Sequence, residues 1–143
     1  MTDWIRLLRL GDESWLGIVA GRLTVGDATG PKRAVDPAHP IGLLPLLERP
    51  YSVVALELKE RETALALAPG AVTGLLSLDD IPRTAVECRS GYWVDLALEW
   101  LESMPPEDVD GALLDTVEQA TWATQRARHR ARRLARQAET RPP

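Results

Sequence analysis

The sequence predicts an α+β fold, in which a small antiparallel sheet from the middle third packs with a Trp-rich central helix and a long C-terminal helix. Three observations support this prediction. Residues 52–58 and 63–67 alternate in side-chain character with period two, which is typical of strands. Residues 92–104 carry apolar side chains at helical spacing. Residues 113–138 carry a seven-residue repeat of small and apolar side chains, which indicates a long helix with one packed edge.

The length of 143 residues is that of one domain. We expect residues 1–138 to form a single globular domain whose Arg-rich C-terminal helix end protrudes, followed by a disordered tail at residues 139–143. Apolar residues make up 45% of the chain and charged residues 27%, which is the balance of an ordinary soluble protein. A core of this size can form without a disulfide or a metal ion.

The cellular compartment is predicted from three features of the sequence. The first residues lack the basic and then apolar pattern of a secretion signal, and no run of about eighteen apolar residues predicts a membrane helix. Cys88 is the only cysteine, which suits a reducing compartment. We therefore expect a cytoplasmic protein that does not contact a membrane.

The first forty residues predict a helix followed by a loop. In residues 3–23, Trp15, Leu16, Val19 and Leu23 recur at helical spacing, with an interruption near Gly11. The glycines in this segment disfavour a helix, so a strand pair over residues 15–25 is the alternative. Residues 26–40 are rich in Gly, Pro and Asp, which predicts a surface loop. Residues 41–47 predict a short helix, which Pro45 and Pro50 keep short.

The middle of the chain predicts the sheet. Residues 52–58 and 63–67 alternate on either side of a short charged connection, which favours a hairpin. Ala, Leu and Glu also favour helices, so the conformation of residues 60–78 is left open between strand and helix. The short apolar runs at residues 71–78 and 84–88 each predict a further strand.

The spacing of apolar residues predicts a helix over residues 92–104 that is apolar on two adjacent faces. Apolar residues recur at intervals of three and four, and Ser90 stands where an N-cap is expected. Only Asp95, Glu99 and Glu102 mark a polar stripe. We therefore expect this helix to lie in the core. Its apolar positions are Trp93, Val94, Leu96, Ala97, Leu98, Trp100, Leu101 and Met104.

The last helix is predicted to run from about residue 107 to residue 138. No glycine after Gly111 and no proline interrupts it, and its seam steps alternately by four and three residues. A helix of about thirty residues is about 45 Å long, whereas a domain of this size is about 37 Å across. The end of the helix is therefore expected to overhang the body. The seam consists of Leu113, Val117, Ala120, Thr124, Ala127, Ala131, Leu134 and Ala138.

The basic residues are skewed in kind and in place. Fifteen of the seventeen are arginine, which indicates the codon bias of a GC-rich bacterial genome. Six arginines within eleven residues contribute +6 to a whole-chain charge of −4, so the rest of the chain carries about −10. The molecule is therefore an acidic body with a basic end. These arginines are Arg126, Arg128, Arg130, Arg132, Arg133 and Arg136.

No motif anchors a catalytic, metal or cofactor site. The Gly26–Arg33 segment lacks the spacing of a phosphate-binding loop. Cys88, His39 and Asp36 supply groups that a nucleophilic mechanism uses, but nothing in the sequence brings them together, and Cys88 is expected to be a small core residue. The spacings that a structural zinc site needs do not occur. We therefore predict a non-enzymatic protein without metal or cofactor.

The C-terminal arginines and Trp122 form the candidate binding surface. Trp122 lies off the alanine-rich seam, so it either fastens the helix to the body or meets a partner. The arginines can be a solvated helix end, a dock for an acidic protein or for a second copy of the chain, or a phosphate-backbone binder. The acidic net charge and the absence of a nucleic-acid-binding motif favour the protein partner. The leading prediction is a cytoplasmic bacterial protein-binding or adaptor module, with an immunity-type or regulatory partner protein as special cases; the alternative is a nucleic-acid-associated protein.

Overall fold

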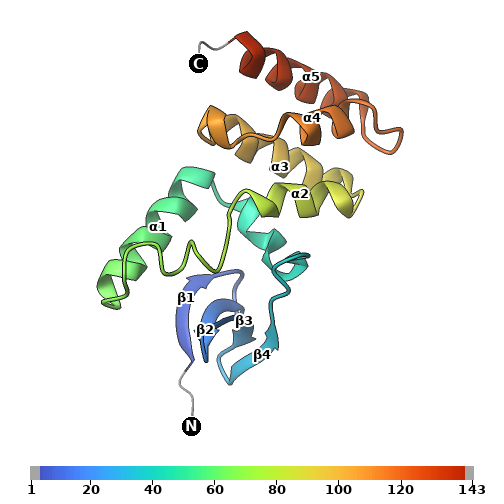
Figure 1. The fold of residues 1–143 in the computed structure, drawn as a ribbon. Coiled ribbons are helices and arrows are strands. Elements are labelled where there is room, and N and C mark those ends of the chain that lie inside the picture. The colour runs from blue at the N-terminus through green and yellow to red at the C-terminus, as the bar shows by residue number, and fades with distance from the viewer. Residues whose placement is uncertain (1–3, 141–143) are drawn as a thin grey trace.

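The α+β prediction is confirmed by the computed structural model, which describes residues 4–140. Four strands come first and helices follow, and the sheet and the last helix lie at opposite ends of the molecule (Figure 1). The elements are β1 (Ile5–Arg9), β2 (Trp15–Val19), β3 (Arg22–Asp27), β4 (Gly30–Ala34), the 3₁₀ helix η1 (Ile41–Glu48), α1 (Tyr51–Ala64), α2 (Asp80–Glu87), α3 (Gly91–Ser103), the 3₁₀ helix η2 (Pro106–Asp108), α4 (Gly111–Glu118) and α5 (Gln125–Thr140).

The sheet comes from residues 5–34, so its predicted origin in the middle third is wrong. Its strand order is β1-β2-β3-β4, and all neighbours are antiparallel. The helix predicted over residues 3–23 is also wrong, and the alternative strand pair over residues 15–25 is present as β2 and β3. The reason lies in Ala20 and Gly21, whose φ angles of 51° and 75° form the two-residue turn that suits a right-twisted hairpin.

Two glycines explain how the outer face of the sheet packs. A Cβ at Gly17 or Gly26 would overlap the ring of Trp4. Because glycine has no side chain at these two positions, the indole can lie directly on the sheet. The other face carries Leu16, Leu23 and their neighbours into the core. The loop predicted at residues 26–40 contains β4, and the short helix predicted at residues 41–47 is confirmed as η1.

The predicted hairpin at residues 52–67 is wrong, because α1 occupies most of it. Val54, Leu58 and Glu62 are four residues apart and form the buried stripe of this helix. The segment left open at residues 60–78 continues α1 to Ala64 and then turns, with no strand. The strands predicted at residues 71–78 and 84–88 are wrong too: the first is a series of turns and the second belongs to α2.

The predicted central helix is confirmed as α3. The Ser90 hydroxyl accepts a hydrogen bond from the Trp93 N–H over 3.4 Å, as expected of an N-cap. Val94, Leu98 and Leu101 are buried on one side of α3, and Ala97 and Trp100 are buried on another.

The single long helix predicted over residues 107–138 is instead two helices, α4 and α5, that pack against each other. Thr124 does not continue the seam; its Oγ1 accepts a hydrogen bond from the Ala127 N–H over 3.1 Å and so caps the start of α5. The two halves of the seam, represented by Leu113 and Val117 on α4 and by Ala131 and Leu134 on α5, are buried within one cluster. The seam that the sequence offered for self-association is therefore buried inside the chain from Leu113 to Leu134, apart from Thr124, and Ala138 is exposed.

The C-terminal end also differs in extent from the prediction. Helix α5 packs on α4 and α3, and its exposed last residues begin at Arg136. Helix α5 ends at residue 140, so the predicted tail at residues 139–143 overlaps its last two residues, and residues 141–143 lie outside the described residues. Within residues 4–140, no helix has both the length and the apolar character needed to cross a membrane.

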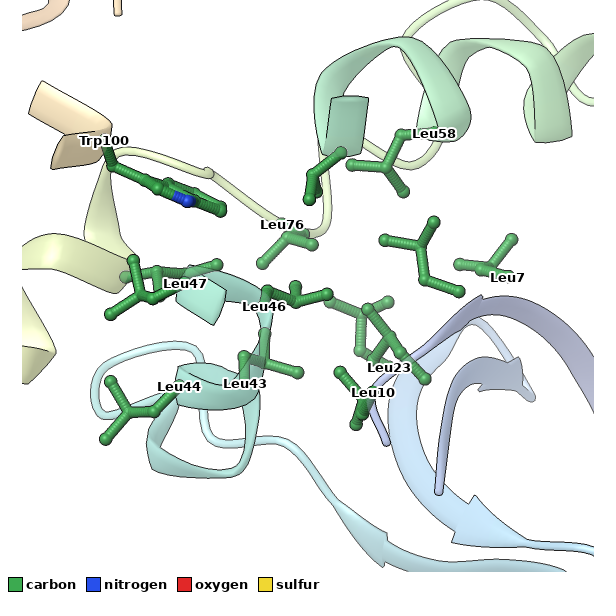
Figure 2. Packing of buried hydrophobic residues seen from close by; sticks show 14 of the residues in the cluster. Leu7, Leu10, Leu23, Leu43, Leu44, Leu46, Leu47, Leu58, Leu76 and Trp100 are labelled. Atoms are coloured by element: carbon green, nitrogen blue, oxygen red, sulfur yellow. The ribbon is translucent and has the colours of Figure 1, made fainter. Parts of the chain in front are cut away.

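Two clusters of buried side chains form the interior. The sheet-side core lies between the sheet, η1, α1 and α2, and Figure 2 shows Trp100 of α3 entering it toward Leu47 and Leu76. The helical core lies between α2, α3, α4 and α5. Tyr51 packs against both clusters and meets Trp100 edge to face, with ring centroids 5.4 Å apart. Trp100 and Tyr51 therefore join the two cores.

Candidate functional site

The arginines predicted to bind a partner are positioned by the buried side of α5. Ala127 and Ala131 are only 2% and 0% exposed, so α5 lies close to its neighbours. The small alanines permit this close approach, and Leu134 closes the far end of the contact. The remaining faces of α5 therefore carry the arginines to the surface on a helix held by its packing.

Three of the six arginines are paired with carboxylates of neighbouring helices. Arg130 donates from Nε and Nη2 to the two oxygens of Glu102 on α3, over 2.7 and 3.0 Å. Arg133 lies 3.9 Å from the same carboxylate, and Arg132 lies 3.7 Å from Glu118 on α4. The bidentate Arg130 pair fixes α5 against α3, and the two longer contacts are solvent-exposed and weaker.

A continuous basic surface remains on the solvent side of α5. Arg126, His129, Arg133 and Arg136 are exposed and follow one another at intervals of three, four and three residues, so they share one face. Within the described residues, Arg126 and Arg136 have no carboxylate at ion-pairing distance. We call these four residues the arginine face.

The arginine face borders a polar hollow of about 620 Å³ between α3 and α5. Negatively and positively charged side chains both line this α3–α5 hollow, because carboxylates of α3 lie opposite the arginines of α5. Glu102 already binds Arg130, which leaves Glu99 and Arg126 as the groups of opposite sign open to a ligand. The lining residues are Glu99, Glu102, Gln125, Arg126, His129, Arg130 and Arg133.

The other two predicted site residues lie apart from this surface. Arg128 is half-buried, and among the described residues its buried Nε atom has no hydrogen-bond partner. Trp122 is half-buried against the helical core and lines a different hollow, of about 460 Å³, with residues of α2 and α4 that include Arg83 and Thr116. Trp122 therefore fastens the α4–α5 connection to the body, and the structure does not bring it together with the arginine face.

The residues considered for catalysis are not assembled. Cys88 is exposed at the end of α2, so the expectation of a core cysteine is wrong. His39 Nδ1 lies 3.4 Å from Glu87 Oε2, and Asp36 accepts a hydrogen bond from the Ala38 N–H over 2.9 Å. Within residues 4–140, no hydrogen bond joins Cys88 to a histidine, and no group of three or more His, Cys, Asp or Glu side chains could hold a metal ion.

Glu102 and Glu118 are the partners that sequence reasoning missed. The available signal is the polar stripe of Asp95, Glu99 and Glu102 on α3. This stripe lies beside α5, and its carboxylates raise the pKa of Arg130, with the hydrogen bond from Arg130 to Glu102 as the largest cause. Oppositely charged stripes on two helices of one chain therefore indicated contact between those helices.

The ion pair predicts a pH-dependent contribution to stability. The hydrogen bond from Arg130 lowers the pKa of Glu102, so the fold favours the carboxylate. The contribution is therefore present above the pKa of the unfolded chain and is lost as pH falls through the lower folded pKa. We expect Glu102→Gln to lower the free energy of unfolding by about 0.5–1 kcal/mol at pH 7 and to have no effect near pH 2. Urea unfolding of both proteins at the two pH values measures this, and an equal difference at both would contradict it.

Comparison with known proteins adds no identification: no family model matches the chain, and searches of curated proteins and of solved structures give no significant match.

Proposed function

We propose that this chain is a non-enzymatic protein-binding or adaptor module that captures an acidic segment of a partner protein through the arginine face of α5. The observation that carries the proposal is the exposure of Arg126 and Arg136 without an internal carboxylate, on a helix whose opposite side is buried. Unpaired guanidinium groups on a rigid support bind carboxylates with little loss of conformational freedom. An acidic partner supplies the complementary charge.

The composition of the hollow favours a protein over nucleic acid. Glu99 and Glu102 stand beside the arginines, and Glu118 pairs with Arg132, so a phosphate backbone following α5 would meet three carboxylates. A protein segment can place its own donors against Glu99 and its carboxylates against Arg126 and Arg136. We place this module in the bacterial cytoplasm, on the arginine bias and the single cysteine.

The proposal is tested by reversing charge on the arginine face. The variant Arg126→Glu/Arg133→Glu/Arg136→Glu is compared with wild type in capture from nuclease-treated lysate of the source organism. We expect wild type to retain a stoichiometric protein and the variant to retain at least about tenfold less, because three attractive contacts become repulsive.

Two matched controls separate this result from general effects of charge. Arg22→Glu/Lys59→Glu/Arg89→Glu makes the same charge change at exposed positions away from α5 and should leave capture unchanged. The thermal unfolding curves of both variants should stay close to wild type, because the substituted side chains are exposed. Equal capture by wild type and the α5 variant contradicts the proposal. Nucleic acid recovered without nuclease, with a steep loss as salt rises, would favour the phosphate-binding alternative.

A further inference from the structure

The two edge strands of the sheet, β1 and β4, differ in whether other parts of the chain form hydrogen bonds to their outward backbone groups. At the β1 edge, Arg61 Nη2 donates to the Arg6 carbonyl over 2.9 Å, and Arg49 Nη1 donates to the Arg9 carbonyl over 3.3 Å. These arginines come from α1 and from the residue after η1, so two carbonyl groups of this edge are occupied by side chains. An edge strand protected in this way is closed to further pairing.

The β4 edge is open. Thr24 of β3 lies opposite Ala34 of β4, and one residue further along the Val35 N–H donates to the Leu23 carbonyl over 2.9 Å. In an antiparallel ladder, hydrogen-bonded and non-hydrogen-bonded pairs alternate, so the N–H and C=O of Ala34 point away from β3. In the part of the chain that the structure describes, no other group is hydrogen-bonded to Ala34.

Two hollows flank this open edge, and both are lined by Ala34, Val35 and Pro40. The first, of about 360 Å³, is mainly apolar and includes Leu23, Leu75 and Leu76. The second, of about 530 Å³, carries both signs of charge, because Lys32 and Arg33 line it together with Asp27 and Asp36, and it also includes Val25 of β3.

The spacing of the two hollows matches that of a strand. Leu23 lines the first hollow and Val25 lines the second, and these residues are two apart on β3. Side chains two apart on a strand lie on one face, so residues i and i+2 of a strand laid beside β4 can each reach one hollow.

The charges at the edge select the occupant. Lys32 and Arg33 are exposed, and neither has a carboxylate at ion-pairing distance within residues 4–140. Asp27 and Asp36 also line the second hollow and keep their charge. Asp27 accepts a hydrogen bond from the Thr29 N–H and Asp36 accepts one from the Ala38 N–H, each over 2.9 Å. The bonds from Thr29 lower the pKa of Asp27, with a smaller contribution from Lys32. Pairing of β4 with β4 of a second copy would place these cations against each other, which disfavours self-association at this edge.

We propose that the free edge of β4 binds an extended peptide segment of another protein by strand addition, with an apolar side chain in the first hollow and an acidic side chain two residues later beside Lys32 and Arg33. Backbone hydrogen bonds to Ala34 supply the pairing, and the hollows supply the sequence preference. This surface is separate from the arginine face and does not depend on its function.

The test uses a fluorescein-labelled peptide in which every second residue is threonine. Of the residues between the threonines, one (position i) is leucine and the next (position i+2) is glutamate. Binding is measured by fluorescence anisotropy, and pairing by the NMR shift and hydrogen-exchange protection of the Ala34 amide. We expect saturable binding with protection of this amide. The same peptide with N-methyl groups on alternate residues, which removes the donors and keeps the charge, should bind at least about tenfold more weakly.

Variants of the protein identify the surface. Ala34→Pro removes the outward N–H and leaves the bond from Val35 to Leu23, and Lys32→Glu/Arg33→Glu reverses the charge. Each should weaken binding at least about tenfold. Leu75→Glu should do the same at the first hollow, with Leu56→Glu as the control, because Leu75 and Leu56 are both exposed leucines and Leu56 lies on α1. The triple charge reversal on α5 should leave this binding unchanged, which distinguishes the two proposals.

Three results would overturn the inference. They are no peptide binding at millimolar concentration, equal binding of the N-methylated peptide, or binding without protection of the Ala34 amide. Lys32→Glu/Arg33→Glu keeps the test decisive if Ala34→Pro fails to fold, because it changes only exposed side chains.

Discussion

Trp100→Ala is expected to lower the free energy of unfolding by about 3–5 kcal/mol. The indole is 1% exposed, so its removal leaves a cavity and forfeits the burial of a large apolar surface. The Trp100 Nε1–H also donates to the Arg49 carbonyl over 2.7 Å, which ties α3 to the chain between η1 and α1. Since Trp100 and Tyr51 join the two cores, we also expect the sheet and the helices to unfold less cooperatively.

Two further variants separate the contributions of Trp100. Trp100→Phe keeps an aromatic ring and loses the hydrogen bond, so its loss of stability should be about 1–2 kcal/mol. Tyr92→Ala removes an aromatic side chain that is 57% exposed, and should cost less than about 1 kcal/mol. Urea unfolding followed by circular dichroism measures all three. A loss below about 1 kcal/mol for Trp100→Ala would show that the cores are not joined at this residue.

Glu62→Leu is expected to destabilise the fold by about 2–4 kcal/mol, although it replaces a charged side chain with an apolar one. Glu62 is 7% exposed on α1, and its carboxylate accepts from the Gly70 N–H over 2.9 Å and from the Val72 N–H over 3.2 Å. Leucine leaves both donors without a partner, and Val72 is fully buried. The carboxylate therefore holds the turns that carry Leu75 and Leu76 to the first hollow.

The control for Glu62 lies on the same helix. Glu60→Leu makes the same change at an exposed position and should alter stability by less than about 0.5 kcal/mol. Glu62→Gln keeps one carbonyl oxygen as an acceptor, so its effect should lie between the two. Urea unfolding and hydrogen exchange of the Gly70 and Val72 amides measure these effects, and unchanged exchange of both amides in Glu62→Leu would contradict the assigned role.

The elements predicted correctly are those specified by local chemistry. The apolar spacing over residues 92–104 together with the Ser90 hydroxyl specifies α3, because a helix periodicity and its N-cap agree. Pro50 likewise stands just beyond the end of the short helix η1, whereas η1 continues through Pro45. The α+β class also followed from the sequence, although the sheet was placed in the wrong segment.

The errors occurred where one pattern satisfies two structures. Val54 and Leu58 fit both an alternating strand and one stripe of a helix. Packing of that stripe against the rest of the protein, where both residues are buried, decides for the helix α1. In residues 15–25, the positive φ angles of Ala20 and Gly21 decide for a hairpin, although the apolar spacing also fits a helix.

For the candidate site, the sequence by itself determined that six arginines lie on a C-terminal helix with a small-residue seam. It did not determine whether the seam is covered by a partner or by the chain itself, because a seven-residue repeat is buried equally well by either. The tertiary structure decided this by folding α5 back on α4, and the same packing brought Glu102 to Arg130 and Glu118 to Arg132. Which arginines remain available to a partner depends on these contacts between distant residues, and local sequence cannot specify them.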